Sequence, residues 1–145
     1  MTTVNIYLTF NGNCQAAFSF YKSVFGGEFS MISKFGDMPN QEGQPPLTPE
    51  MSDLIMHVSL PISNETVLMG CDSGGEWAPA FLPGNNFSVS IATGSKEEAD
   101  RLFYELSAGG KITMPLNMMF WGEYFGMFTD KFGINWMVSF RPEVK

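Results

Sequence analysis

The chain has 145 residues, of which 8 are Lys or Arg and 15 are Asp or Glu, so its formal charge is −7 at pH 7. This length suits about one domain with its own hydrophobic core. The acidic balance argues against nucleic acid as a partner, because the phosphate backbone is bound by clustered Lys and Arg. Only two cysteines occur and no apolar stretch is long enough to span a membrane, so we expect a cytoplasmic protein without disulfides or a membrane partner.

The first half of the chain predicts a strand, a helix and three more strands. Apolar and polar residues alternate over 4–10, and Asn13 is the expected N-cap of a helix over 14–25. Gly26-Gly27 should end that helix. The three further strands are expected over residues 28–35, 54–62 and 66–71.

Two stretches lack any regular period and are expected to connect elements. Residues 37–53 carry four prolines and predict a long connection. Residues 72–86 are rich in Gly and Pro and form the best candidate linker between the two halves.

The second half predicts the same order of elements. A strand over 87–93 precedes Ser95 and Glu98, which are spaced as a capping box for an amphipathic helix that ends at Gly109-Gly110. The aromatic-rich segment 120–140 is broken by the turn residues 129–133, which predicts a hairpin of two strands.

The two halves also share a motif. Phe-Tyr, four residues and Gly-Gly occur at Phe20 to Gly27 and again at Phe103 to Gly110, an offset of 83 positions. The same offset superposes the apolar faces of the preceding strands. The sequence therefore predicts two copies of a strand, helix, three-strand unit, with Phe20 and Phe103 at equivalent helix positions.

The chain resembles the vicinal oxygen chelate superfamily, which has the glyoxalase and bleomycin-resistance fold, and within it the PhnB-like branch. The resemblance implies an α+β fold of two paired βαβββ modules, about 1–75 and 82–145 of a single domain. It also implies a curled, mainly antiparallel eight-stranded sheet around a cavity, usually in a homodimer. The stretches that carry it are Tyr7–Asn13, Phe20–Gly27, Ile55–His57, Asn86–Ser88, Gly110–Pro115, Phe120–Gly122, Thr129–Gly133 and Asn135–Met137.

The metal enzymes of this superfamily typically place four His or Glu ligands on the first and last strands of each module. The matching positions here are about Asn5, Met69, Ser88 and Met137. Thioethers favour soft metals, and neutral amides or hydroxyls bind divalent ions weakly. His57 is the only histidine. We therefore expect no catalytic metal and no cofactor.

The candidate binding residues combine hydroxyl, imidazole, thioether and indole groups. Strand alternation puts the serines and Tyr7 opposite the helix-packing face, where hydroxyls can orient a ligand in an apolar pocket. Trp121 can supply a flat apolar wall, although core packing or a dimer seam is an alternative, and His57 can equally be a hydrogen-bonded structural residue. The set is Tyr7, His57, Met69, Ser88, Ser90, Trp121 and Met137.

These residues favour a metal-independent protein that binds a small molecule and has no catalytic residue. A divalent-metal-dependent lyase or dioxygenase of the same superfamily is one alternative. A non-catalytic interaction dimer is the other. The identity of the ligand does not follow from the sequence.

Overall fold

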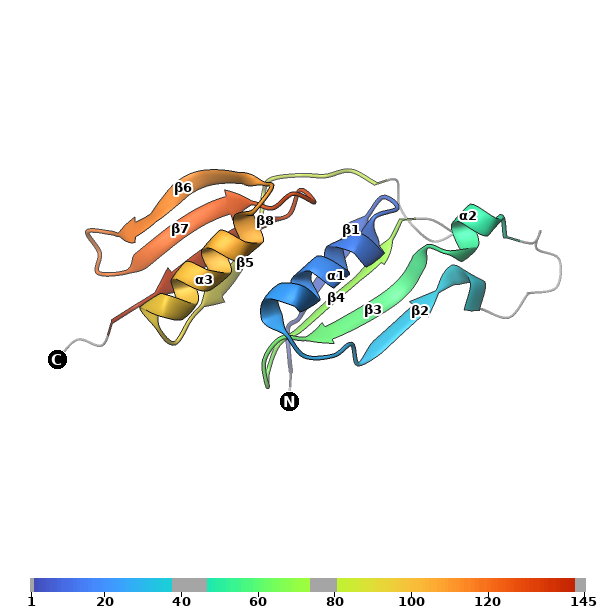
Figure 1. Ribbon diagram of the computed structural model, residues 1–145, viewed down its shortest axis with the longest axis horizontal. Helices are drawn as coiled ribbons and strands as arrows, with labels where there is room; N and C mark the ends of the chain where they lie inside the picture. Colours follow the sequence, from blue (N-terminus) through green and yellow to red (C-terminus); the bar gives the residue numbers. More distant parts are fainter. Residues whose placement is uncertain (1, 38–46, 74–80, 143–145) are drawn as a thin grey trace. The chain divides into compact units, whose positions relative to one another are not determined.

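The computed structural model describes residues 2–37, 47–73 and 81–142. The chain divides into two compact units, Met1–Leu82 and Pro83–Lys145. Both units contain one four-stranded sheet and one 12-residue helix in the order strand, helix, three strands (Figure 1). The α+β class with two βαβββ modules is confirmed, and the eight strands are divided between two sheets.

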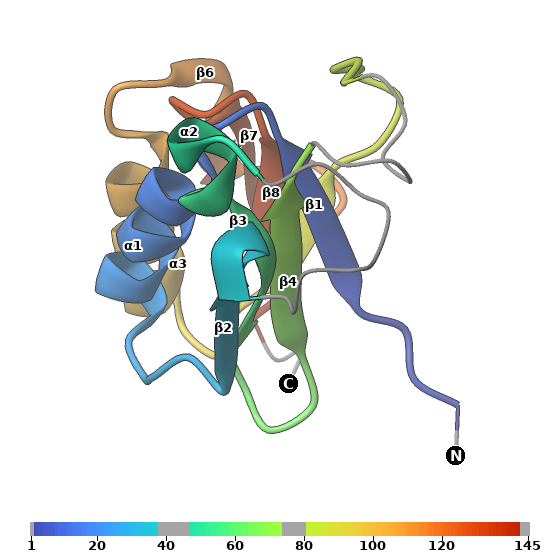
Figure 2. The ribbon, with the colours of Figure 1, turned by 90° about the vertical axis from the view of Figure 1, so that its right-hand side faces the viewer.

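The first unit pairs its strands in the order β1-β4-β3-β2. Strands β1 and β4 run parallel, whereas β3 is antiparallel to both β2 and β4. Helix α1 lies along one side of this sheet (Figure 2). The elements are β1 (Ile6–Phe10), α1 (Cys14–Phe25), β2 (Met31–Lys34), η1 (Phe35–Asp37), α2 (Pro49–Ser52), β3 (Ile55–Pro61) and β4 (Val67–Asp72).

Three expectations for this unit need correction. The strand expected over 28–35 covers only Met31–Lys34 and is followed by a 3-10 turn. The connection expected over 37–53 contains the short helix α2, because the Thr48 hydroxyl accepts a hydrogen bond from Met51 N at 3.3 Å and Pro49 preorganises the first turn. Residues 38–46 of that connection lie outside the described residues. Asn13 is the N-cap residue of α1 as predicted, but its side chain forms no capping hydrogen bond.

The second unit repeats the topology with the strand order β5-β8-β7-β6. Strands β5 and β8 are parallel, and the other two pairs are antiparallel. The predicted capping box holds in part, since Ser95 Oγ accepts from Glu98 N at 3.0 Å. The elements are β5 (Val89–Ala92), α3 (Lys96–Ser107), β6 (Lys111–Met118), β7 (Tyr124–Thr129) and β8 (Asn135–Phe140).

A glycine in each sheet allows an aromatic ring from the helix to approach the strands. A Cβ atom at Gly70 would lie 2.7 Å from Cε2 of Phe18, and one at Gly126 would lie 2.7 Å from Cε2 of Phe103. Phe103 also packs edge-on against Phe128, with ring centroids 5.2 Å apart. The helix-facing side of each sheet is therefore tightly packed, and the opposite side is the one available to a ligand.

The internal repeat is present, but its register in the helices differs from the predicted offset by one residue. Tyr21 and Phe103 each lie seven residues after the first residue of their helices, at Cys14 and Lys96, and both are fully buried. Phe20 and Phe103 are thus not equivalent. The cause is an extra residue, Ala108, between the end of α3 and its Gly-Gly pair.

Candidate functional site

Each sheet has one face that packs against its helix and one that does not, and we call the second its open face. On the first sheet Leu8, Val58 and Leu68 are buried beneath the helix. Their neighbours therefore point the other way, because successive side chains of a strand alternate. Three predicted site residues, Tyr7, His57 and Met69, share this open face, and Tyr7 is directly opposite Met69 in the parallel ladder.

A short chain of hydrogen bonds crosses the open face of the first sheet. The Tyr7 hydroxyl lies 3.3 Å from Nδ1 of His57, and Nε2 of His57 lies 2.8 Å from Oγ of Ser59. With the imidazole proton on Nε2, Tyr7 donates to Nδ1 and Nε2 donates to Ser59. Tyr7 is 48% exposed, whereas Ser59 is only 8% exposed. This series of hydrogen bonds thus links the buried Ser59 hydroxyl to the Tyr7 hydroxyl, which an incoming molecule can reach.

The Tyr7 phenol is held in its neutral form. Burial raises its pKa to about 12, and the neighbouring Cys71 thiol contributes in the same direction. At neutral pH Tyr7 therefore offers a hydrogen-bonding hydroxyl and carries no charge. Burial also raises the pKa of Cys14 well above its ordinary range, followed by the effect of Asp72, so Cys14 is an inert core thiol.

The open face of the second sheet contains Ser90 and Met137, which are partners in the β5–β8 ladder. Ser88 is half-buried, precedes β5 and is two residues from Ser90, so it continues the same side. Ser90 is exposed and Met137 is half-buried. This unit therefore brings three of its four predicted residues onto one face.

Trp121 is in the turn between β6 and β7. Its side chain is 44% exposed, and its indole N–H donates to Oε1 of Glu123 at 3.2 Å. The ring contacts Phe120 and Phe125, with centroids 5.0 and 6.1 Å away. Core packing for Trp121 is therefore wrong. Of the two tryptophans among the described residues, Trp136 is the fully buried one.

Sequence reasoning missed Ser59 and two further open-face residues, Met114 and Met127. The signal for Ser59 was available, because it follows His57 by two positions on one strand and so shares its face. Met114 was not detectable, since register shifts on both sides of it change the face that a regular alternation predicts.

Three of the four residues at the superfamily's metal positions are poorly suited to a divalent ion: Met69 and Met137 offer soft thioethers, and the Asn5 side chain has another partner. Asn5 uses its side-chain oxygen to accept from Val67 N at 3.1 Å. Within residues 2–37, 47–73 and 81–142, no three His, Cys, Asp or Glu side chains gather as a metal site requires.

In the same residues, no helix has the length and apolar character needed to cross a membrane.

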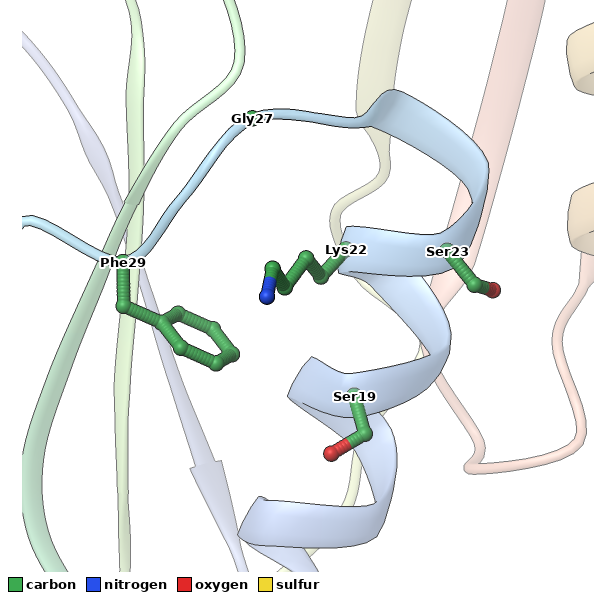
Figure 3. A pocket seen from close by; sticks show the side chains of 5 residues that line it. All are labelled: Ser19, Lys22, Ser23, Gly27 and Phe29. Atoms are coloured by element: carbon green, nitrogen blue, oxygen red, sulfur yellow. The ribbon is translucent and has the colours of Figure 1, made fainter.

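A pocket outside the open faces lies beside α1 (Figure 3). It has a volume of about 400 Å³ and is lined by Ser19, Lys22, Ser23, Gly27 and Phe29. Its one ammonium group already has partners, because Lys22 Nζ is 3.2 Å from Glu28 and 5.4 Å from the centre of the Phe29 ring. None of the predicted site residues lines this pocket.

The fold is that of the glyoxalase/bleomycin resistance/dioxygenase superfamily, also called the vicinal oxygen chelate superfamily. A glyoxalase/bleomycin resistance protein from Albidiferax ferrireducens T118 has the same fold, with a TM-score of 0.62 and 15% identity over 95% of this chain and 97% of that one.

Residues 2–139 match the family described as 3-demethylubiquinone-9 3-methyltransferase, so the chain belongs to this PhnB-like family. It is 31% identical to protein YjdN of Escherichia coli K12 over 92% of this chain and 91% of the relative. The structure of PA1353 from Pseudomonas aeruginosa is similar, with a TM-score of 0.82 and 38% identity over 99% of this chain and all of that one. A putative 3-demethylubiquinone-9 3-methyltransferase, PhnB protein, from Bacillus cereus has a TM-score of 0.71 and 26% identity over 96% and 99% of the two chains.

Proposed function

We propose that this chain binds a small, partly apolar molecule at the open faces of its sheets and does so without a catalytic divalent metal. The observation that carries the proposal is the hydrogen-bonded series Tyr7, His57 and Ser59 on the first open face. It presents an oriented neutral hydroxyl beside the Met69 thioether. A few placed polar groups in apolar surroundings are typical of small-molecule sites.

The side chains on the open face of the first sheet favour an uncharged ligand there. The described open-face residues of β1, β3 and β4 include Tyr7, His57, Met69 and Cys71, and none of these is a Lys, Arg, Asp or Glu. A ligand with a phosphate or carboxylate would need a compensating Lys or Arg to offset its desolvation. A hydroxyl or carbonyl group on an apolar body matches these residues better.

The methyl transfer in the family's description and the metal-dependent chemistry of the wider superfamily are the catalytic alternatives. Metal-dependent chemistry is disfavoured by the donor set at Asn5, Met69, Ser88 and Met137, which provides no carboxylate or imidazole. We also propose a cytoplasmic location, which the free thiols of Cys14 and Cys71 support. The homodimer implied by the resemblance stays a prediction.

A thermal-shift screen with uncharged aromatic and aliphatic compounds tests this function. Compounds that raise the melting temperature of the wild-type protein should lose that effect in Tyr7→Phe or in Trp121→Ala. Since Trp121 is 44% exposed, its replacement should change the unfolding free energy by less than about 1 kcal/mol in the absence of ligand. Tyr104→Phe is the matched control, because Tyr104 is 60% exposed on α3.

Two results would contradict the proposal. If both variants keep the full ligand-induced shift for every active compound, the open faces are not the site. If binding disappears after treatment with a metal chelator and returns with Zn²⁺ or Mn²⁺, the site is metal-dependent and the superfamily's enzymatic alternative is correct.

A further inference from the structure

Three methionines lie side by side on the open face of the second sheet. Met114 on β6 is the ladder partner of Met127 on β7, and Met127 is in turn the partner of Met137 on β8. Ser90 of β5 continues the row beyond Met137. We call Met114, Met127 and Met137 the methionine row.

The row is on the side of the sheet away from α3. Phe128 and Trp136, the chain neighbours of Met127 and Met137, are buried at 1% and 0% exposure, and Phe128 contacts Phe103 of the helix. Alternation therefore turns the two methionines outward. Met127 and Met137 are half-buried and Met114 is 36% exposed, so solvent reaches the row.

The spacing of the row allows three sulfur atoms to meet at one point. Neighbouring strands are about 4.8 Å apart, so β6 and β8 are separated by about 10 Å, with Met127 midway. A methionine side chain is unbranched and has three rotatable bonds, and its sulfur is two bonds beyond Cβ. The two outer side chains can therefore lean toward the central one without any movement of the backbone.

The chemistry of three neutral thioethers selects a particular class of ion. Thioether sulfur is a soft ligand and favours Cu(I) over Mg²⁺, Ca²⁺ or Mn²⁺, which prefer oxygen. The formal charge of −7 adds a general attraction for cations. We propose that the methionine row binds a soft monovalent cation of the Cu(I) class. This site shares Met137 with the divalent-metal positions of the superfamily, but its other two donors, Met114 and Met127, lie outside those positions.

The first sheet supplies an internal comparison. Its corresponding row runs from Met31 through Ser59 and Met69 to Tyr7. A serine stands at the centre, where the second sheet has Met127. Two thioethers separated by a hydroxyl lack the central sulfur, so the first sheet should not form the same three-sulfur site.

The test uses Ag(I) as a redox-inert probe, added as the nitrate in chloride-free buffer to protein labelled with ¹³C at the methionine methyl groups. A Cys71→Ser background removes the half-buried thiol, which would itself bind Ag(I), while Cys14 is fully buried. At one equivalent, the methyl signals of the methionine row should shift together in the NMR spectrum. Met118 should not respond, although it is 55% exposed, because it is the partner of Tyr124 on the helix-facing side of β6.

Substitutions that conserve volume complete the test. In a calorimetric titration of the same background, Met127→Leu should weaken Ag(I) binding at least tenfold, and Met118→Leu should leave it unchanged. Unshifted signals for the methionine row at one equivalent, or wild-type affinity in Met127→Leu, would overturn the proposal. An equal response to Zn²⁺ would refute the soft-cation class, and the NMR result stands even if a variant folds poorly.

Discussion

The first N–H group of helix α1 donates to a residue far along the chain, whereas α3 is capped locally. Oδ1 of Asp72 accepts from the backbone N–H groups of Gly12 at 3.0 Å and Cys14 at 2.9 Å, across sequence separations of 60 and 58 residues. At α3 the Ser95 hydroxyl accepts from Glu98, three residues away. Two units of one topology thus begin their helices by different means, and only the second is visible as a local motif.

The buried carboxylates show the same contrast. Asp72 joins three parts of the first unit, because its second oxygen accepts from Ile55 N at the start of β3, at 2.9 Å. Asp130 serves one hairpin of the second unit: it accepts from Phe132 N, Ile134 N and the Trp136 indole, all within six residues. A long-range carboxylate ties β1, α1, β3 and β4 together, whereas a local one shapes a turn.

The largest expected loss of stability follows the substitution of Asp72, which is only 2% exposed. Asp72→Ala removes the acceptor of three backbone N–H groups, and a buried donor left without a partner costs roughly 1–3 kcal/mol. We expect the free energy of unfolding, measured by urea denaturation, to fall by about 3 kcal/mol or more. Asp72→Asn keeps the shape and should lose less. A loss below about 1 kcal/mol for the alanine variant would contradict the role of Asp72 as the first unit's central tie.

A smaller effect distinguishes the two helix caps. Ser95→Ala should lower the free energy of unfolding by about 1 kcal/mol, because the Glu98 N–H loses its partner. Asn13→Ala is the matched variant at the same position of α1 and should cost less than about 0.5 kcal/mol, since its side chain forms no cap. Equal losses in the two variants would show that Asn13 caps α1 in solution.

The smallest expected effect is the loss of stability at high pH that comes from one tyrosine in each unit, Tyr7 and Tyr124. The pKa of Tyr124 is raised to about 12, chiefly by its hydrogen bond to Asp100, whereas burial is the main cause for Tyr7. A folded pKa above the ordinary 10 means that the folded state binds more protons between pH 10 and 12. Stability from these groups is therefore present below about pH 10 and lost as the pH rises toward 12.

Absorbance at about 295 nm follows the ionisation of the phenols. Asp100→Asn should return the pKa of Tyr124 toward its ordinary value and leave that of Tyr7 near 12. Tyr124→Phe and Tyr7→Phe identify which phenol each step belongs to. If Asp100→Asn moves neither phenol, the hydrogen bond to Asp100 is not what raises the pKa of Tyr124.

The element order could be predicted because its signals are local. Alternation over Ile6–Phe10 and Asn135–Phe140 predicted strands with one buried face, and both Trp136 and Val138 are fully buried. The Gly-Gly pairs and the spacing of Ser95 and Glu98 predicted where the helices end and begin. That alternation also predicted that Tyr7 and Ser90 lie on the face opposite the helix-packing residues, but their role in binding stays a prediction.

The sequence by itself determined the order of the main strands and of the two long helices, and the apolar face of the regular ones, because those properties depend on residues within one or two turns or a few strand positions. Only the tertiary structure decided that Asp72 caps α1, that Tyr7 reaches His57 and that Met114 aligns with Met127. Each of these contacts depends on strand order or on a register shift. Strand order and register shifts leave no local signature in the sequence, since the residues that meet are brought together by the ladder between strands.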